Sequence, residues 1–339
     1  MQLACPSFEL SNTLGLHSQA ERVFEAHHDD EVIEAARWAV DHGLPLVPLG
    51  AGSNVVLPPK LNAAVIHCAD TSVQVCERSS NDAVLRVGAG KNWHELVNET
   101  VESGYFGLEN LALIPGNVGA APVQNIGAYG SELSAFVEQV HGVDLDSMQT
   151  RVFTAQECAF SYRGSIFKHR FRDRFVITAL TLRLPTEFEP LTAYPSLAAA
   201  LEHLSGAPTA RDVLDAVVAV RTERLPDPLY EPNAGSFFKN PVVGADLVER
   251  LRKIHPQIPA HRQSDGRCKL SAAWLIEHSG LRGHQRGGAA VSELHALVLV
   301  NRGAATQANV LDLAAHIAAT VELRFGVELR VEPRIYTGV

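Results

Sequence analysis

The spacing of apolar and polar residues in the first third of the chain predicts helices that alternate with short strands. Residues 30–43 place apolar side chains at helical spacing and end at Gly43, a residue type that often follows the last helical turn. Residues 93–104 repeat this pattern, and short apolar runs typical of buried strands lie between the two segments. The alternation predicts an α/β arrangement.

The pattern changes twice in the rest of the chain. Residues 137–184 are rich in strand-like runs, whereas residues 185–232 carry seven prolines around one helical segment, which predicts a domain boundary. Further on, an apolar strand over 296–301 precedes a long helix over 306–326. The apolar face of that helix consists of Val310, Leu313, Ala314, Ile317 and Val321. At 339 residues, the chain is expected to form two or three domains.

The composition excludes several classes of protein. A net charge of −9 and an isoelectric point of about 5.9 give no broad basic surface for nucleic acid. We expect no signal peptide and no membrane span, because the first residues lack a basic and an apolar region and no apolar run is long enough. The five cysteines have no C-x-x-C spacing and are expected to be free thiols in a reducing cytoplasm. They are Cys5, Cys68, Cys76, Cys158 and Cys268.

No metal site is expected, although the chain has fifteen histidines. There is no H-E-x-x-H motif, and His27 and His28 are neighbours in sequence, so they cannot share one face of a helix. We interpret the stretch HHDD as a solvated segment in which Asp30 caps the helix that follows.

Two glycine-containing stretches are candidates for ligand binding. The glycine-rich loop, residues 114–130, reads IPGNVGAAPVQNIGAYG, and its interleaved apolar residues predict a packed loop whose amides face a ligand. The stretch GAGSNVV at 50–56 is not a dinucleotide fingerprint, because Val55 replaces the third glycine and Pro58 prevents the required helix. By itself this stretch could be a plain turn or a phosphate-binding nest.

Several long stretches together resemble the UDP-N-acetylenolpyruvoylglucosamine reductase (MurB) family, in particular its type I members. In order and approximate spacing, they are PLGAGSN, GLENLALIPGNVGAAPVQNIGAYGSE, FSYRGSIFK, NAGSFFKNP, KLSAAWLIEHSGLRG and HALVLVN. The resemblance covers nearly the whole chain and implies a two-lobed FAD-binding domain of the PCMH type, like that of vanillyl-alcohol oxidase, with a C-terminal α+β substrate-binding domain. The domains it implies are two FAD-binding lobes (1–67 and 68–187), a tyrosine-loop insert with a connecting helix (188–223), a substrate-binding domain (224–325) and a C-terminal return strand (326–339).

The resemblance also implies which residues bind the cofactor. The amides near Gly116, Val118, Gly119 and Gly127 would donate to the FAD pyrophosphate without supplying a formal charge. Ala51 stands where the family usually has glycine, and its methyl group requires a negative φ. The full implied set is Gly50, Ala51, Gly52, Ser53, Asn54, Pro115, Gly116, Val118, Gly119, Gln124, Asn125, Gly127 and Tyr129.

Three residues match the family's catalytic positions. Arg163, which could otherwise be a surface ion-pair residue, would hold the substrate carboxylate. Ser236, which could otherwise be a turn residue, would protonate the substrate carbon. Glu332 would assist Arg163, and Glu328 is the competing candidate for that role.

The remaining implied contacts concern the substrate. Tyr194 would fold over the sugar nucleotide, and Arg224 stands where the family more often has lysine, so a forked cation would bind the diphosphate. The full implied set is Tyr162, Tyr194, Arg224, Lys239, Asn240, Lys269 and His295.

The resemblance implies a cytoplasmic, FAD-dependent enzyme that uses NADPH to reduce UDP-N-acetylglucosamine enolpyruvate to UDP-N-acetylmuramate in peptidoglycan synthesis. We expect a monomer. Two alternatives stay open: a flavin oxidase of alcohols or sugars on the same fold, and a sugar-nucleotide-binding module that has lost its flavin. The retained Arg163 and Ser236 argue against the second.

Overall fold

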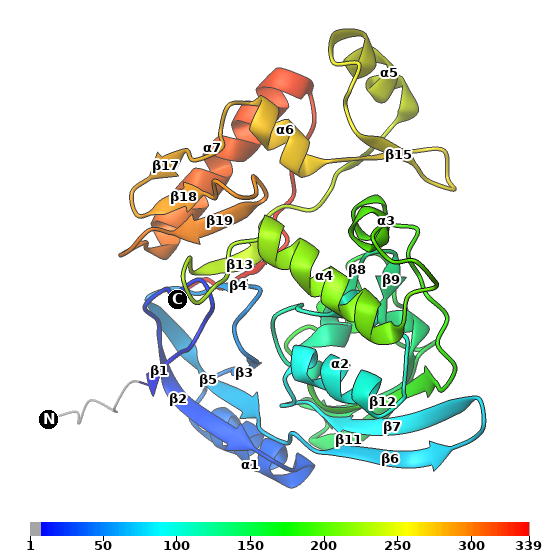
Figure 1. Cartoon of the computed structure of the whole chain (residues 1–339). Coiled ribbons are helices and arrows are strands. Elements are labelled where there is room, and N and C mark those ends of the chain that lie inside the picture. Colours follow the sequence, from blue (N-terminus) through cyan, green and yellow to red (C-terminus); the bar gives the residue numbers. More distant parts are fainter. Residues whose placement is uncertain (1–7, 339) are drawn as a thin grey trace, which may run out of the picture. The chain divides into compact units, whose positions relative to one another are not determined.

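The computed structural model describes residues 8–338, and they form two compact units (Figure 1). Unit 1 contains residues 20–51 and 62–223, together with Phe8. Unit 2 contains residues 9–19, 52–61 and 224–338, so the chain passes between the units several times. Each unit has its own hydrophobic core.

Unit 1 is built mainly on two sheets. A four-stranded sheet has the order β1 (Phe8–Glu9), β2 (Gln19–Ala26), β5 (Lys60–Cys68) and β3 (Leu46–Pro48). A five-stranded sheet has the order β11 (Gln149–Thr154), β10 (Val137–Asp144), β12 (Phe175–Pro185), β7 (Asp82–Gly88) and β6 (Val73–Arg78). The pair β8 (Gly127–Ala128) and β9 (Ser131–Glu132) lies within and just after the glycine-rich loop. All described pairings in the five-stranded sheet are antiparallel, and β3 pairs with β5 in parallel.

The helices of unit 1 agree with the helical spacing of apolar residues in the sequence. They are α1 (Asp29–Asp41), α2 (Trp93–Glu102), α3 (Pro195–Leu201) and α4 (Ala210–Arg224). Short 3-10 turns are η1 (Glu109–Leu111), η2 (Val118–Val123), η3 (Leu133–Ala135) and η4 (Ile166–Lys168). The expectation that Asp30 caps α1 is wrong, because His28 is the N-cap residue and Asp30 lies in the first turn. The carboxylate of Glu31 accepts the His28 amide, at 3.1 Å, so a residue inside the helix satisfies this backbone donor.

Unit 2 combines small sheets with three helices. Its four-stranded sheet has the order β13 (Asn233–Ser236), β19 (Val298–Asn301), β18 (Ala289–Val291) and β17 (Gln285–Arg286). A second sheet contains β14 (Val242–Val243), β16 (Cys268–Leu270) and β15 (Ala260–Arg262), and β20 (Arg334–Ile335) pairs in parallel with β4 (Val55–Val56). The helices are α5 (Ala245–Ile254), α6 (Ala272–His278) and α7 (Gln307–Phe325).

Helix α7 supplies much of the core of unit 2 and packs against β17 and β18 (Figure 1). Its five apolar residues expected from the sequence are all buried, which confirms that part of the prediction. Thr306 caps its first turn, and Gly326 ends it with a φ of +65°. Among the described residues, no helix is both long and apolar enough to cross a membrane.

Candidate functional site

The glycine-rich loop has an unusual backbone conformation. Asn125 and Tyr129 have left-handed φ values of 49° and 47°, and Gly116 has a φ of 123°. Leu113, directly before the loop, has a φ of 57°. Such conformations cost free energy in residues other than glycine, and they concentrate at binding and catalytic sites. This loop is therefore held in a fixed, strained shape by its surroundings.

Backbone hydrogen bonds fix the first half of the loop within unit 1. The amide of Val118 donates to the carbonyl of Lys91, at 2.8 Å, and the amide of Gly119 donates to the carbonyl of Ala89, at 2.9 Å. The carbonyl of Gly116 accepts from Trp93, at 3.0 Å. The amides of Val118 and Gly119, which the family resemblance assigned to the FAD pyrophosphate, therefore donate within the protein. We assign them to holding the loop in its shape.

Asn125 is also engaged internally. Its side chain is fully buried, donates to Glu132 at 2.8 Å, and accepts the Ser134 amide at 2.9 Å. We therefore assign its side chain to holding the loop rather than to a ligand. The neighbouring Gln124 accepts from Lys168 Nζ at 3.2 Å.

Asn117 connects the two glycine-containing stretches, and the sequence reasoning missed it. Its Oδ1 accepts the amide of Ala51 at 2.7 Å, and its Nδ2 donates to the carbonyl of Gly90 at 2.7 Å. Ala51 avoids the left-handed region, which is occupied instead by Gly52 at a φ of 64°. The methyl group of Ala51 is thus compatible with the turn. One sequence feature could have indicated Asn117, namely its amide side chain within a run of glycines and prolines.

Arg163 lies against the glycine-rich loop within unit 1. Its Nη2 donates to the carbonyl of Gly127 at 2.8 Å, and its guanidinium carbon is 5.3 Å from the centre of the Tyr162 ring. The backbone of Arg163 is itself left-handed, at a φ of 55°. The structure therefore brings this predicted catalytic residue to a predicted cofactor-binding position, and it leaves Tyr162 exposed.

Arg221 is a further cation in this region that the sequence reasoning missed. Its Nε is inaccessible to solvent and has no hydrogen-bond partner. Burial lowers the pKa of its guanidinium; Tyr129 opposes this effect, whereas the like charge of Arg163 adds to it. Among the described residues, Arg221 has no ion-pair partner. Arg221 as a whole is half-buried, and a poorly solvated cation is costly without an anion, so a bound anion beside it would fit these features.

One sequence feature could have indicated that Arg221 is a candidate site residue, namely its position on α4. It lies four residues after the buried Val217 and directly after the buried Val220, so an arginine occupies the apolar side of an amphipathic helix. Arg224, which the sequence reasoning singled out, is exposed.

Ser236 and Glu332 come together in unit 2. Ser236 ends β13 opposite Val298 and follows Gly235, which has a φ of 70°. The amide of Glu332 donates to the carbonyl of Phe237, the residue after Ser236, at 2.9 Å. Phe238 also forms an antiparallel bridge with Val331. The strand segments that carry the two predicted catalytic residues are therefore neighbours, although 96 positions separate them in sequence (332 − 236).

Glu328, the competing candidate, has a different environment. Its carboxylate lies 3.3 Å from Arg330, and the two side chains are 67% and 76% exposed, respectively. Ion pairs that are exposed to this degree contribute little. Of the two glutamates, only Glu332 adjoins the Ser236 segment through a described backbone contact.

The other predicted substrate residues lie in both units. In unit 1, the ring of Tyr194 packs edge-on against Tyr129 at 5.2 Å. In unit 2, Oδ1 of Asn240 accepts the amide of Ala272 at the start of α6, at 2.9 Å. Lys269 lies on β16, and Lys239 donates its amide to Arg330 at 2.9 Å.

His295, also in unit 2, is a neutral hydrogen-bond acceptor. Its Nδ1 accepts the Leu297 amide at 3.2 Å. Burial lowers the pKa of its imidazole, and the cations of Arg282 and Arg224 act in the same direction. His295 therefore lies in a cationic part of unit 2, together with the predicted diphosphate-binding Arg224.

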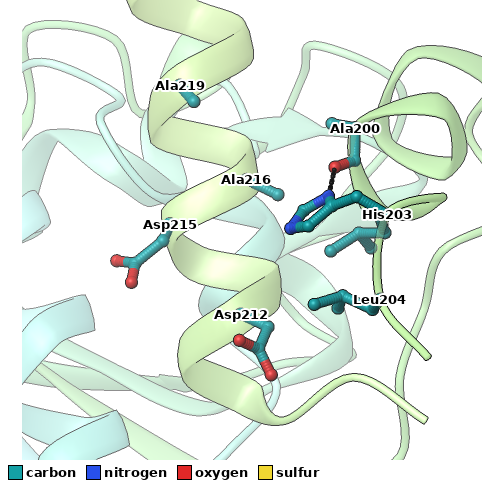
Figure 2. Close-up of a pocket in the computed structure, with 8 residues that line it drawn as sticks. Ala200, His203, Leu204, Asp212, Asp215, Ala216 and Ala219 are labelled. Carbon is teal, nitrogen blue, oxygen red and sulfur yellow. Dashed lines mark hydrogen bonds between the residues drawn. The ribbon is translucent and has the colours of Figure 1, made fainter. Parts of the chain in front are cut away.

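A pocket of about 240 Å³ lies between the end of α3 and α4, away from the residues discussed above (Figure 2). Its lining is Ala200, Leu201, His203, Leu204, Asp212, Asp215, Ala216 and Ala219. Figure 2 shows His203 bonded to the carbonyl of Ala200, while Asp215 points away from His203. No predicted site residue lines this pocket, so we assign it no role.

The described residues contain no cluster of three or more side chains suited to a metal ion. Cys68, Cys76, Cys158 and Cys268 are free thiols. Burial raises the pKa of Cys68 and of Cys158 to about 12, so neither is a reactive thiolate near neutral pH. Cys5 lies outside the described residues.

The comparisons with known proteins first define the class. Residues 20–153 match the family model described as an FAD binding domain, and residues 227–336 match the C-terminal domain of UDP-N-acetylenolpyruvoylglucosamine reductase. The chain is therefore a flavoprotein with an FAD-binding domain and a second domain specific to one group of reductases.

Relatives along the whole chain define that group. Proteins named UDP-N-acetylenolpyruvoylglucosamine reductase from Pseudomonas syringae pv. tomato and Paraburkholderia xenovorans are 42% and 47% identical. The first match covers 96% of both chains, and the second covers 95% of this chain and 94% of its relative. The chain belongs to the UDP-N-acetylenolpyruvoylglucosamine reductase family.

A solved structure agrees with this assignment at the level of the fold. The reductase from Thermus caldophilus has a TM-score of 0.69 and 22% identity, covering 98% of this chain and 99% of that one. The predicted fold class, with a PCMH-type FAD-binding domain and a C-terminal α+β domain, is thus confirmed.

Proposed function

We propose that this chain catalyses the NADPH-dependent reduction of UDP-N-acetylglucosamine enolpyruvate to UDP-N-acetylmuramate, a step of peptidoglycan precursor synthesis. The observation that carries the proposal is the match to reductases of this name over at least 95% of the chain. FAD, when bound, would supply two-electron redox chemistry between NADPH and the enolpyruvyl group, and its reduced form would be more negative than its oxidised form.

The residues of unit 1 fit FAD. The glycine-rich loop has a strained, well-fixed backbone, and Asn117 ties it to the stretch that begins at Gly50. Such a loop can present amides to phosphates without a charged side chain. With Val118, Gly119 and the Asn125 side chain engaged internally, we propose that the remaining predicted positions, such as Gly116 and Gly127, approach the cofactor.

We propose that two arginines of unit 1 each bind an anionic group, one on the substrate and one on the cofactor. We assign Arg163 to the substrate carboxylate, where a guanidinium fork stabilises the charge that develops during reduction. Arg221 acts electrostatically on Tyr129, Arg163 and His94. Because Tyr129 belongs to the glycine-rich loop and His94 bonds Leu113 directly before that loop, we assign Arg221 to FAD. An anion beside Arg221 would offset the cost of burying that cation.

Ser236 and Glu332 are assigned the substrate's proton chemistry. A serine hydroxyl is a weak acid, so it can protonate the substrate carbon only from a fixed position at short range. The adjoining strands that carry Ser236 and Glu332 support such a position. Glu332 would favour the enolate form of the substrate together with Arg163.

We assign binding of the sugar nucleotide to Tyr162, Tyr194, Arg224, Lys239, Asn240, Lys269 and His295. Three further expectations remain predictions. They are a monomeric enzyme, its location in the cytoplasm, and the division of the chain into functional parts at 1–67, 68–187, 188–223, 224–325 and 326–339.

The oxidase alternative is less well supported, because residues 227–336 match a domain named for the reductase. The test is anaerobic. Enzyme reduced with NADPH is mixed with UDP-N-acetylglucosamine enolpyruvate, and the flavin absorbance should return within the turnover time. Reoxidation by oxygen alone, with none by the enolpyruvyl compound, would overturn the proposal. A protein that is colourless and cannot be reconstituted with FAD would do the same.

A further inference from the structure

The side chain of Asn110 joins two segments that are far apart in the sequence. Asn110 lies in η1 and is 3% exposed. Its Nδ2 donates to the carbonyl of Tyr129 at 2.9 Å and to the carbonyl of Leu191 at 2.8 Å. Both hydrogens of the amide are therefore used, one on the glycine-rich loop and one on residues 186–194, which we call the tyrosine segment.

The tyrosine segment has its other contacts near its two ends. It contains no helix or strand, and Leu191 and Tyr194 are 45% and 48% exposed. At its start, the amide of Thr186 donates to the carbonyl of Asn81 at 3.0 Å, and its hydroxyl donates to the carbonyl of Ser80 at 2.7 Å. The ring of Phe188 packs against the core of unit 1 and against Phe106 at 5.6 Å. Near its end, the ring of Tyr194 contacts Tyr129. The bond from Asn110 is thus a polar attachment in the middle of an exposed, irregular segment.

We propose that Asn110 is a positioning residue that holds the tyrosine segment, and with it Tyr194, against the glycine-rich loop. The inference rests on the proposed function, in which Tyr194 covers the sugar nucleotide and the loop holds FAD. Because one amide group binds both carbonyls, the position of Tyr194 depends on the shape of the cofactor loop. Asn110 therefore acts through Tyr194 and does not itself touch the reacting atoms.

An amide suits this task better than the alternatives. It provides two donors in one plane, whereas a serine hydroxyl provides one, and a carboxylate would repel both carbonyls. Replacing Asn110 by alanine leaves both carbonyls without this donor. The exposed tyrosine segment can recover hydrogen bonds from water only by moving away from the loop.

The test compares Asn110→Ala and Asn110→Ser with a matched control, Asn98→Ala. Asn98 is a half-buried asparagine of unit 1 that binds Arg211, the carbonyl of His94 and, at 3.4 Å, the His94 ring, but not the tyrosine segment. Hydrogen exchange should become faster in peptides covering 186–194 for Asn110→Ala and stay unchanged for Asn98→Ala. The KM for the enolpyruvyl sugar nucleotide should rise about tenfold, the size expected for one or two lost hydrogen bonds. Asn110→Ser should give a smaller rise.

A second measurement separates positioning from general damage. Flavin reduction by NADPH should remain within about twofold of wild type in each Asn110 variant, because that half-reaction does not use Tyr194. In a Tyr194→Ala background, Asn110→Ala should have no further effect on KM. Additive effects, equal slowing of both half-reactions, or unchanged hydrogen exchange would overturn the inference. If instead wild-type enzyme fails to reduce the sugar nucleotide, the proposed function itself fails.

Discussion

The amide of Leu113 donates a 3.1 Å hydrogen bond to Nδ1 of His94, at the point where the glycine-rich loop begins. This bond requires an unprotonated Nδ1. Burial lowers the pKa of His94, and the nearby Arg221 acts in the same direction. The proton state of one imidazole is therefore linked to the anchoring of the cofactor-binding loop.

This linkage predicts that the stability of the protein and its retention of FAD both decrease at acidic pH. Because the folded pKa lies below the ordinary histidine value of about 6.5, the unfolded chain binds the proton more tightly, and stability falls as the pH drops below that value. Protonation also removes the acceptor for Leu113, which costs about 1–3 kcal/mol. We expect both Tm and FAD retention to fall as the pH drops below about 6.5. His94→Asn, which keeps an acceptor without titrating, should flatten this slope.

His17 offers a control. Its contact with Glu9 is exposed and contributes little, so His17→Asn should leave the profile of Tm against pH nearly unchanged. Burial lowers the pKa of His141, His295 and His316 as well, so His94→Asn should remove only part of the acid sensitivity. An unchanged pH profile of FAD retention in His94→Asn would contradict the link to the loop.

Ser236→Ala separates a catalytic from a structural serine. NADPH should still reduce the flavin, because that half-reaction does not use the hydroxyl. Reoxidation by the enolpyruvyl substrate should slow by at least about a hundredfold, the low end for a positioned acid. Ser236→Cys should recover part of this loss. Stopped-flow absorbance of the flavin measures both steps, and Ser292→Ala, which alters a buried serine of unit 2, serves as the control. Equal slowing of both steps would instead indicate a displaced cofactor.

Arg221→Met tests whether this cation faces FAD. Removing a positive charge beside a group that gains negative charge should lower the midpoint potential of the bound flavin by at least about 30 mV. For a two-electron couple, this corresponds to about 1.4 kcal/mol. Arg221→Lys should restore part of the shift. If the potential stays constant while the KM for the sugar nucleotide rises, Arg221 serves the substrate and our assignment is incorrect.

Glu332→Gln and Glu328→Gln distinguish the two candidate glutamates. Because Glu332 adjoins the Ser236 segment, its replacement should slow flavin reoxidation by roughly a hundredfold. The exposed ion pair of Glu328 with Arg330 contributes little, so Glu328→Gln should change neither half-reaction nor, by more than about 1 kcal/mol, the stability. The reverse order of effects would transfer the catalytic role to Glu328.

Local patterns in the sequence predicted much of the fold. Helices α1, α2 and α7 follow from apolar spacing with a terminating glycine, because periodicity and glycine conformation act over a few residues. Long, specific motifs also indicated the glycine-rich loop and Arg163, which the structure brings together.

Long-range pairing was not readable in the same way. Nothing local distinguishes Asn110 from any other polar loop residue, although its amide bonds both Tyr129 and Leu191, which lies 81 positions after Asn110. Likewise, the glycine-rich sequence indicated that the backbone amides of this loop are accessible. It did not indicate that the amides of Val118 and Gly119 donate to carbonyl groups of the chain itself. These details depend on which strands and loops become neighbours after folding.

The division of the chain has a consequence for folding during synthesis. Residues 62–223 form most of unit 1 as one continuous stretch, so this part can fold while the ribosome is still adding unit 2. By contrast, β4 finds its parallel partner β20 only after residues 334–335 have been made. A chain that stops before these residues therefore leaves β4 without its partner strand, although β4 was among the first strands to be made.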